Sequence, residues 1–113
     1  MSKKDEYQLE FLKITSGGEV GYNCIRKNEI LDKNNLLQFL TYLNISRTEL
    51  LLKEVNYHLN NSNLNLGSYN SVILEHIDLE INYPNFIIDE QPDVFPLIDI
   101  RDLLQEWLLF LQS

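Results

Sequence analysis

Apolar side chains near the C-terminus recur at spacings of three and four residues, and this pattern constrains the fold more than any other. The stripe consists of Ile100, Leu103, Leu104, Trp107, Leu108 and Leu111. Such spacing places these side chains on one face of an α-helix. Because a large apolar face is unfavourable in water, we expect this helix, over residues 98–112, to cover a sheet or other helices.

The start of this helix is predicted at Asp99, whose carboxylate can accept hydrogen bonds from the N–H groups of the first turn. Leu109 lies on the opposite face, and Phe110 lies at the edge of the stripe. A single exposed leucine is ordinary on a protein surface. The alternative is that Leu109 and Phe110 contact a partner.

The length of 113 residues suits one domain, spanning residues 1–113. Cys24 is the only cysteine, so an internal disulfide is excluded, and its alternation with apolar neighbours predicts a small core residue. The first residues lack the apolar segment of a signal peptide, and no apolar run is long enough to span a membrane. We therefore expect a cytoplasmic protein without membrane partners.

Two β-hairpins and two helices are predicted before the C-terminal helix. Residues 7–14 and 20–25 alternate apolar and polar side chains around Gly17-Gly18, as in a hairpin. Helices are predicted from Asp32 to Asn44 and from Ser46 to Leu59, the second with a Ser-x-x-Glu capping box.

A second hairpin follows a polar loop over residues 60–71. Its strands are predicted at residues 72–82 and 86–89, and an acidic loop over residues 89–93 leads to the last helix. The order is ββααββα with three helices. The fold class is therefore α+β with a mainly antiparallel sheet.

The net charge of −8 is unevenly distributed along the chain. The segment from Glu54 to Ile100 carries eight acidic side chains and neither lysine nor arginine. This argues against nucleic acid and anionic membranes as partners, because both require basic surfaces. The charge either keeps a small protein soluble or attracts a basic partner.

The sequence lacks the motifs that mark common catalytic and cofactor sites, including GxGxxG, the P-loop, HExxH and paired cysteines. His58 and His76 stand apart in the sequence, so each is interpreted as a structural or surface residue. We expect neither a metal nor another cofactor, and no enzymatic activity. The acidic side chains are read as a solvated surface, a protein-binding surface or, least favoured, an acid–base pair.

Residues 95–111, F-P-L-I-D-I-R-D-L-L-Q-E-W-L-L-F-L, follow an acidic hairpin strand. This ending, together with the size and acidity of the chain, resembles small bacterial immunity proteins of contact-dependent and other polymorphic toxin systems. The resemblance covers about the last forty residues. It implies a cytoplasmic antidote that binds a toxin, often a basic nuclease domain, and carries no catalytic residues.

The sequence therefore predicts a non-enzymatic immunity protein that neutralises a basic toxin through an acidic surface. The alternative is a small acidic adaptor or assembly subunit with a partner that is not a toxin. The expected partner-binding residues are Asp78, Glu80, Asp89, Glu90, Asp93, Leu109 and Phe110.

Overall fold

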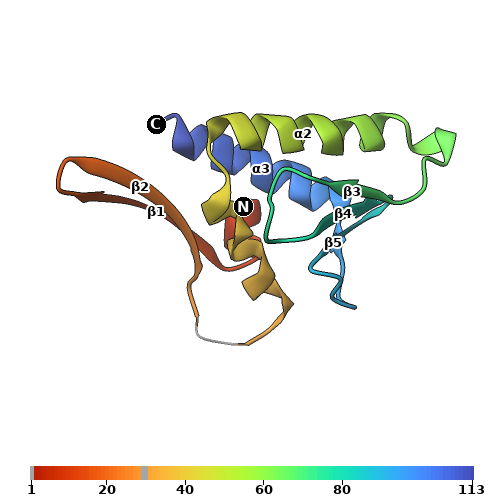
Figure 1. Cartoon of the computed structure of the whole chain (residues 1–113). Helices are drawn as coiled ribbons and strands as arrows, with labels where there is room; N and C mark the ends of the chain where they lie inside the picture. The colour runs from red at the N-terminus through yellow and green to blue at the C-terminus, as the bar shows by residue number, and fades with distance from the viewer. Residues whose placement is uncertain (1, 29–30) are drawn as a thin grey trace.

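The chain forms two antiparallel sheets and a set of helices, as a computed structural model shows for residues 2–28 and 31–113 (Figure 1). The elements are α1 (Lys3–Glu6), β1 (Leu9–Ser16), β2 (Glu19–Arg26), the 3₁₀ helix η1 (Lys33–Tyr42), α2 (Ile45–Asn60), the 3₁₀ helix η2 (Ser62–Leu64), β3 (Tyr69–Ser71), β4 (Leu79–Asn82), β5 (Asn85–Ile88), β6 (Phe95–Pro96) and α3 (Leu97–Leu111). The predicted α+β class is confirmed, whereas the order ββααββα matches only in outline.

The predicted first hairpin is present, with β1 paired to β2 along the whole length of both strands. Gly17 and Gly18 form its turn with φ of 58° and 85°, which glycine adopts without steric cost. Leu9 and Cys24 bury the base of the hairpin in the core. Its tip extends away from the rest of the molecule (Figure 1).

The helix predicted after Asp32 is a 3₁₀ helix rather than an α-helix. Asp32 caps it as expected, because its carboxylate accepts a hydrogen bond from the N–H of Asn34 at 2.9 Å. Leu37 and Leu40 of this helix are buried in the core, and so is Leu43, which directly follows the helix. A spacing of three residues equals one turn of a 3₁₀ helix, so these leucines form one apolar line.

The next helix, α2, begins one residue before the predicted cap Ser46. Its cap is Asn44, whose side-chain oxygen accepts a hydrogen bond from the N–H of Arg47 at 2.8 Å. Leu51 and Val55 are fully buried on the inner face. This face packs along α3, so the two long helices lie side by side (Figure 1).

The second sheet has the order β3-β4-β5-β6 and differs from the predicted strands. Only Leu79–Asn82 of the strand expected over residues 72–82 is a strand, and β3 lies in the expected polar loop. Leu79 and Ile81 point into the core, so the apolar face of β4 agrees with its alternation. The edge strand β3 covers one side of β4.

The predicted start of α3 at Asp99 is wrong, because the helix begins at Leu97 after Pro96. Instead of capping the helix, the Asp99 carboxylate accepts a hydrogen bond from the Tyr7 hydroxyl at 2.6 Å. It also lies 3.1 Å from the ammonium of Lys3. Asp99 therefore fastens the N-terminal segment to α3.

Trp107 is the centre of the core, as the apolar stripe predicts. It is fully buried, and its indole N–H donates a hydrogen bond to the carbonyl of Leu43 at 2.9 Å. The Phe11 ring of β1 meets it edge-on at 4.9 Å between centroids. Helix α3 therefore packs with the first hairpin, η1 and α2 in one hydrophobic core.

Candidate functional site

An acidic turn ends β5. Asp89 and Glu90 have φ of 52° and 56°, and the N–H of Gln91 donates to the carbonyl of Ile88 at 3.1 Å. Side chains other than glycine rarely adopt this left-handed conformation, because the Cβ atom crowds the backbone. Two acidic residues thus occupy positions where asparagine or glycine would cost less.

Asp89 holds this turn against the loop before β4. Its carboxylate accepts a hydrogen bond from the N–H of Asp78 at 3.0 Å, and its own N–H donates to the carbonyl of Asp78 at 2.8 Å. The side chain of Asp89 is therefore structural as well as charged. The carboxylate of Asp78 is left exposed to solvent.

A hollow of about 460 Å³ opens beside the acidic turn, between the turn, β3 and the loop before β4. It is lined by Asn70, Ser71, Val72, Leu74, Glu75, Asp78, Leu79, Glu80 and Glu90. This acidic hollow contains four carboxylates, and the described residues that line it include neither lysine nor arginine. The structure thus brings the predicted residues Asp78, Glu80 and Glu90 together and adds Glu75, which the sequence did not single out.

Asp93 lies outside the acidic hollow, in the exposed loop after the turn. The Lys33 side chain lies beside this loop, where its ammonium donates a hydrogen bond to the carbonyl of Val94 at 3.1 Å. The same ammonium lies 5.2 Å from the centre of the Phe95 ring. The segment from Glu54 to Ile100 contains neither lysine nor arginine, but in the fold Lys33 of η1 lies next to it.

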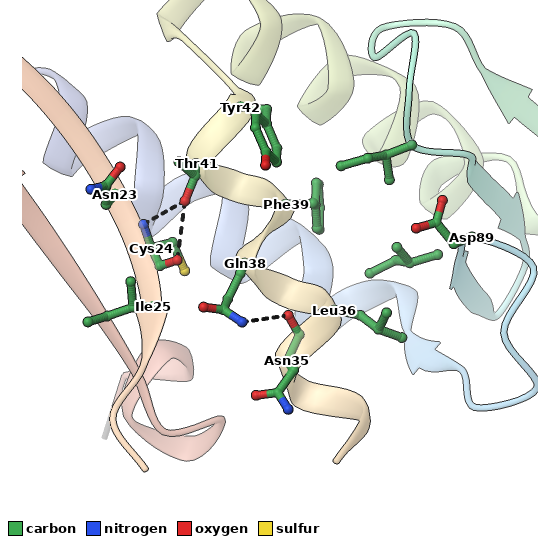
Figure 2. A pocket seen from close by; sticks show the side chains of 12 residues that line it. Asn23, Cys24, Ile25, Asn35, Leu36, Gln38, Phe39, Thr41, Tyr42 and Asp89 are labelled. Atoms are coloured by element: carbon green, nitrogen blue, oxygen red, sulfur yellow. Dashed lines mark hydrogen bonds between the residues drawn. The ribbon is translucent and has the colours of Figure 1, made fainter. Parts of the chain in front are cut away.

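On its other side, Asp89 borders a groove of about 460 Å³ between β2, η1 and the end of β5. Figure 2 shows Leu36, Phe39 and Tyr42 of η1 on the side of the groove nearer Asp89. Across η1, the Thr41 hydroxyl accepts from the Cys24 N–H at 2.9 Å and donates to its carbonyl at 3.2 Å. Thr41 therefore occupies the edge of β2 at this point.

The predicted apolar contacts Leu109 and Phe110 do not lie beside the acidic residues. Leu109 is 70% exposed near the C-terminal end of α3, about 18 Å along the helix axis from Leu97, at roughly 1.5 Å per residue. Phe110 is half-buried against Phe11, Tyr22 and Trp107. The two side chains lie apart from the acidic residues, because α3 runs from the second sheet toward the first hairpin (Figure 1).

A second cluster, which the sequence analysis missed, lies between α2 and β3. A cavity of about 410 Å³ there is lined by Lys53, Glu54, Tyr57, His58, Leu66, Ser68 and Tyr69. We call it the tyrosine pocket. The Tyr69 hydroxyl donates to the Glu54 carboxylate at 3.0 Å, and burial together with this carboxylate raises the pKa of Tyr69.

His58 is the buried member of this pocket, with 6% of its surface exposed. Among the described residues, its Nδ1 atom is buried without a hydrogen-bond partner, as is Oε1 of Glu54. The spacing of four residues between Glu54 and His58 was the available signal, because it places both on one helix face. The sequence did not indicate that β3 places Tyr69 next to Glu54 and His58.

Cys24 is buried, and this burial raises the pKa of its thiol to about 12, as expected of a core cysteine. Among residues 2–28 and 31–113, no three His, Cys, Asp or Glu side chains are grouped to hold a metal ion. In the same residues, no helix is long and apolar enough to cross a membrane.

No protein-family model, curated protein or solved structure matches the chain.

Proposed function

We propose that the chain is a non-enzymatic protein-binding module, an immunity protein that neutralises a basic toxin domain through the acidic hollow. The observation that carries this proposal is the convergence of Glu75, Asp78, Glu80 and Glu90 around one cavity lined by neither lysine nor arginine. Like charges held close together repel one another, and a cationic partner surface would relieve that repulsion.

The surroundings of the hollow support a protein partner over a purely solvated surface. Val72, which lines the hollow, is 85% exposed, and Tyr42, on the neighbouring groove, is half exposed. Protein interfaces combine exposed apolar and aromatic side chains with a polar rim. The acidic turn borders both cavities, with Asp89 lining the groove that contains Tyr42 and Glu90 lining the hollow that contains Val72.

A nuclease toxin fits the charge of the hollow. Surfaces that bind nucleic acid are rich in lysine and arginine, because they neutralise phosphate groups. An acidic surface can occupy the same cations and accelerate the encounter through long-range attraction. The resemblance of residues 95–111 to immunity proteins points to the same class of partner.

Growth protection tests the proposal in cells. The product of the gene immediately upstream is expressed alone and together with this protein, and growth and nucleic-acid integrity are followed. We expect the upstream product to arrest growth alone and to lose this effect when the acidic protein is present. Binding without any toxic effect of the upstream product would instead support an adaptor, and absence of binding would contradict the choice of partner.

A further inference from the structure

Two residues that line the tyrosine pocket each carry a polar atom for which the described residues provide no hydrogen-bond partner. They are Oε1 of Glu54 and Nδ1 of His58, both buried. The second carboxylate oxygen of Glu54 is already bound by the Tyr69 hydroxyl at 3.0 Å. Buried polar atoms in proteins are nearly always hydrogen-bonded to protein, water or ligand, so these two atoms have capacity for a further partner.

Aromatic rings surround these atoms. The His58 ring lies 5.3 Å from the Tyr69 ring and 5.7 Å from the Tyr57 ring, measured between centroids. Tyr57 is 54% exposed and Tyr69 is 37% exposed, so both rings remain accessible to a ligand. The pocket therefore combines a carboxylate with accessible π faces, and both favour a cation.

We propose that the tyrosine pocket receives an arginine side chain of the basic partner protein. The guanidinium would donate to Glu54 Oε1 and His58 Nδ1 and stack on the tyrosine rings. Arginine suits this set better than lysine, because its planar group carries five N–H donors and stacks on aromatic faces. This inference rests on the proposed function, since a basic partner would supply the arginine.

The pocket and the acidic hollow both border β3, the edge strand of the second sheet. Tyr69 lines the pocket, whereas the next residue, Asn70, lines the hollow and pairs with Glu80. One partner that binds across this edge could therefore reach both surfaces with different basic side chains.

Entry into the pocket requires movement at its rim, because both acceptor atoms are covered in the free protein. Tyr57 and Lys53 are exposed on α2, so these are the side chains that would turn aside. Lys53 also lines the pocket, and its positive charge opposes a second cation. Replacement of Lys53 by methionine should therefore strengthen binding of the arginine.

The test is an NMR titration of the whole protein with N-acetyl-arginine methylamide. A separate titration with the corresponding lysine derivative provides the comparison. We expect saturable shifts of the His58 and Tyr69 side-chain resonances with the arginine probe and weaker ones with the lysine probe. Glu54→Gln keeps an oxygen acceptor for Tyr69 and should weaken the arginine probe about tenfold, the usual effect of losing a charge-assisted hydrogen bond. Glu49→Gln, an exposed position on the same helix, is the matched control and should change nothing.

Absence of saturable shifts at His58 and Tyr69, or equal binding by wild type and Glu54→Gln, would overturn the inference. The full partner separates this failure from failure of the proposed function. If the upstream gene product binds wild type and Glu54→Gln equally, the pocket inference fails and the immunity proposal stands. If the arginine probe binds but the upstream product does not, the pocket stands and the partner is wrong.

Discussion

Asp89 and Asp78 hold each other through two hydrogen bonds, one from the Asp78 N–H to the Asp89 carboxylate at 3.0 Å and one from the Asp89 N–H to the Asp78 carbonyl at 2.8 Å. This contact joins the acidic turn to the loop before β4 and so fixes the two sides of the acidic hollow. Charge and structure are therefore coupled at Asp89 but separable at Glu90, whose side chain only lines the hollow.

The first prediction separates the charge of Asp89 from its hydrogen bond to the Asp78 N–H. Asp89→Ala should lower the free energy of unfolding by about 1 kcal/mol, because it removes the acceptor for the Asp78 N–H. Asp89→Asn keeps an acceptor and tolerates the left-handed conformation, so it should stay within about 0.5 kcal/mol of wild type. Urea unfolding followed by fluorescence measures both. Equal losses for alanine and asparagine would show that the carboxylate does not support the turn.

Glu90 gives the second prediction. Glu90→Asn removes a charge from the hollow and places a residue that tolerates a φ of 56° in the turn. We expect the variant to be at least as stable as wild type in thermal melts. A clear loss of stability would mean that Glu90 makes a favourable interaction beyond the lining of the hollow.

The third prediction concerns the core. Trp107→Ala should destabilise the protein by about 3–5 kcal/mol, because it removes a fully buried aromatic ring. Trp107→Phe retains most of the ring but leaves the carbonyl of Leu43 without its donor, and should cost less. Denaturant unfolding compares the two. A change below about 1 kcal/mol for alanine would contradict the central place of this side chain in the core.

Cys24 provides a prediction for pH. Burial raises the pKa of its thiol from the ordinary 9.0 to about 12, so the native protein keeps the proton that the unfolded chain releases near pH 9. The stability from this group is complete below pH 9 and is lost as pH rises toward 12. Native protein should therefore resist iodoacetamide from pH 7 to pH 10, while urea-unfolded protein reacts increasingly. Rapid native labelling at pH 8 would show that the thiol is accessible.

Elements whose structure depends on neighbouring residues alone could be predicted from the sequence. The glycine pair at Gly17-Gly18 and the flanking alternation predicted the first hairpin, and the leucine and tryptophan spacing predicted α3. The line of Leu37, Leu40 and Leu43 has a period of three, which fits a 3₁₀ helix better than the expected α-helix.

Features that depend on distant residues could not be predicted in the same way. Asp99 resembles a helix cap, but the Tyr7 hydroxyl and the Lys3 ammonium, both far away in sequence, bind its carboxylate instead. The short edge strand β3 has a polar sequence and depends on its pairing with β4.

The candidate site was predicted only in part for the same reason. The acidic residues close to one another in sequence were identified, but their separation from Leu109 depends on the direction of α3. The tyrosine pocket requires the chain to reverse after α2, with left-handed Asn65 and Gly67 on the return to Tyr69. Side-chain periodicity carries no information about that reversal.

The most direct test is the association rate with the upstream gene product at low and at high salt. The variant for this test combines Asp78→Asn, Glu80→Gln and Glu90→Asn, which removes three charges from the hollow without disturbing the Asp89 carboxylate. The matched control combines Glu10→Gln, Glu19→Gln and Glu49→Gln, which removes the same charge from exposed positions elsewhere.

We expect the hollow variant to associate about tenfold more slowly than wild type at low salt, with a much weaker salt dependence, because the attraction is local. The control should remain close to wild type, and only the hollow variant should lose protection of cells. Equal association rates for the hollow variant and wild type at low salt, with protection retained, would show that the acidic hollow is a solvated surface and that the partner binds elsewhere.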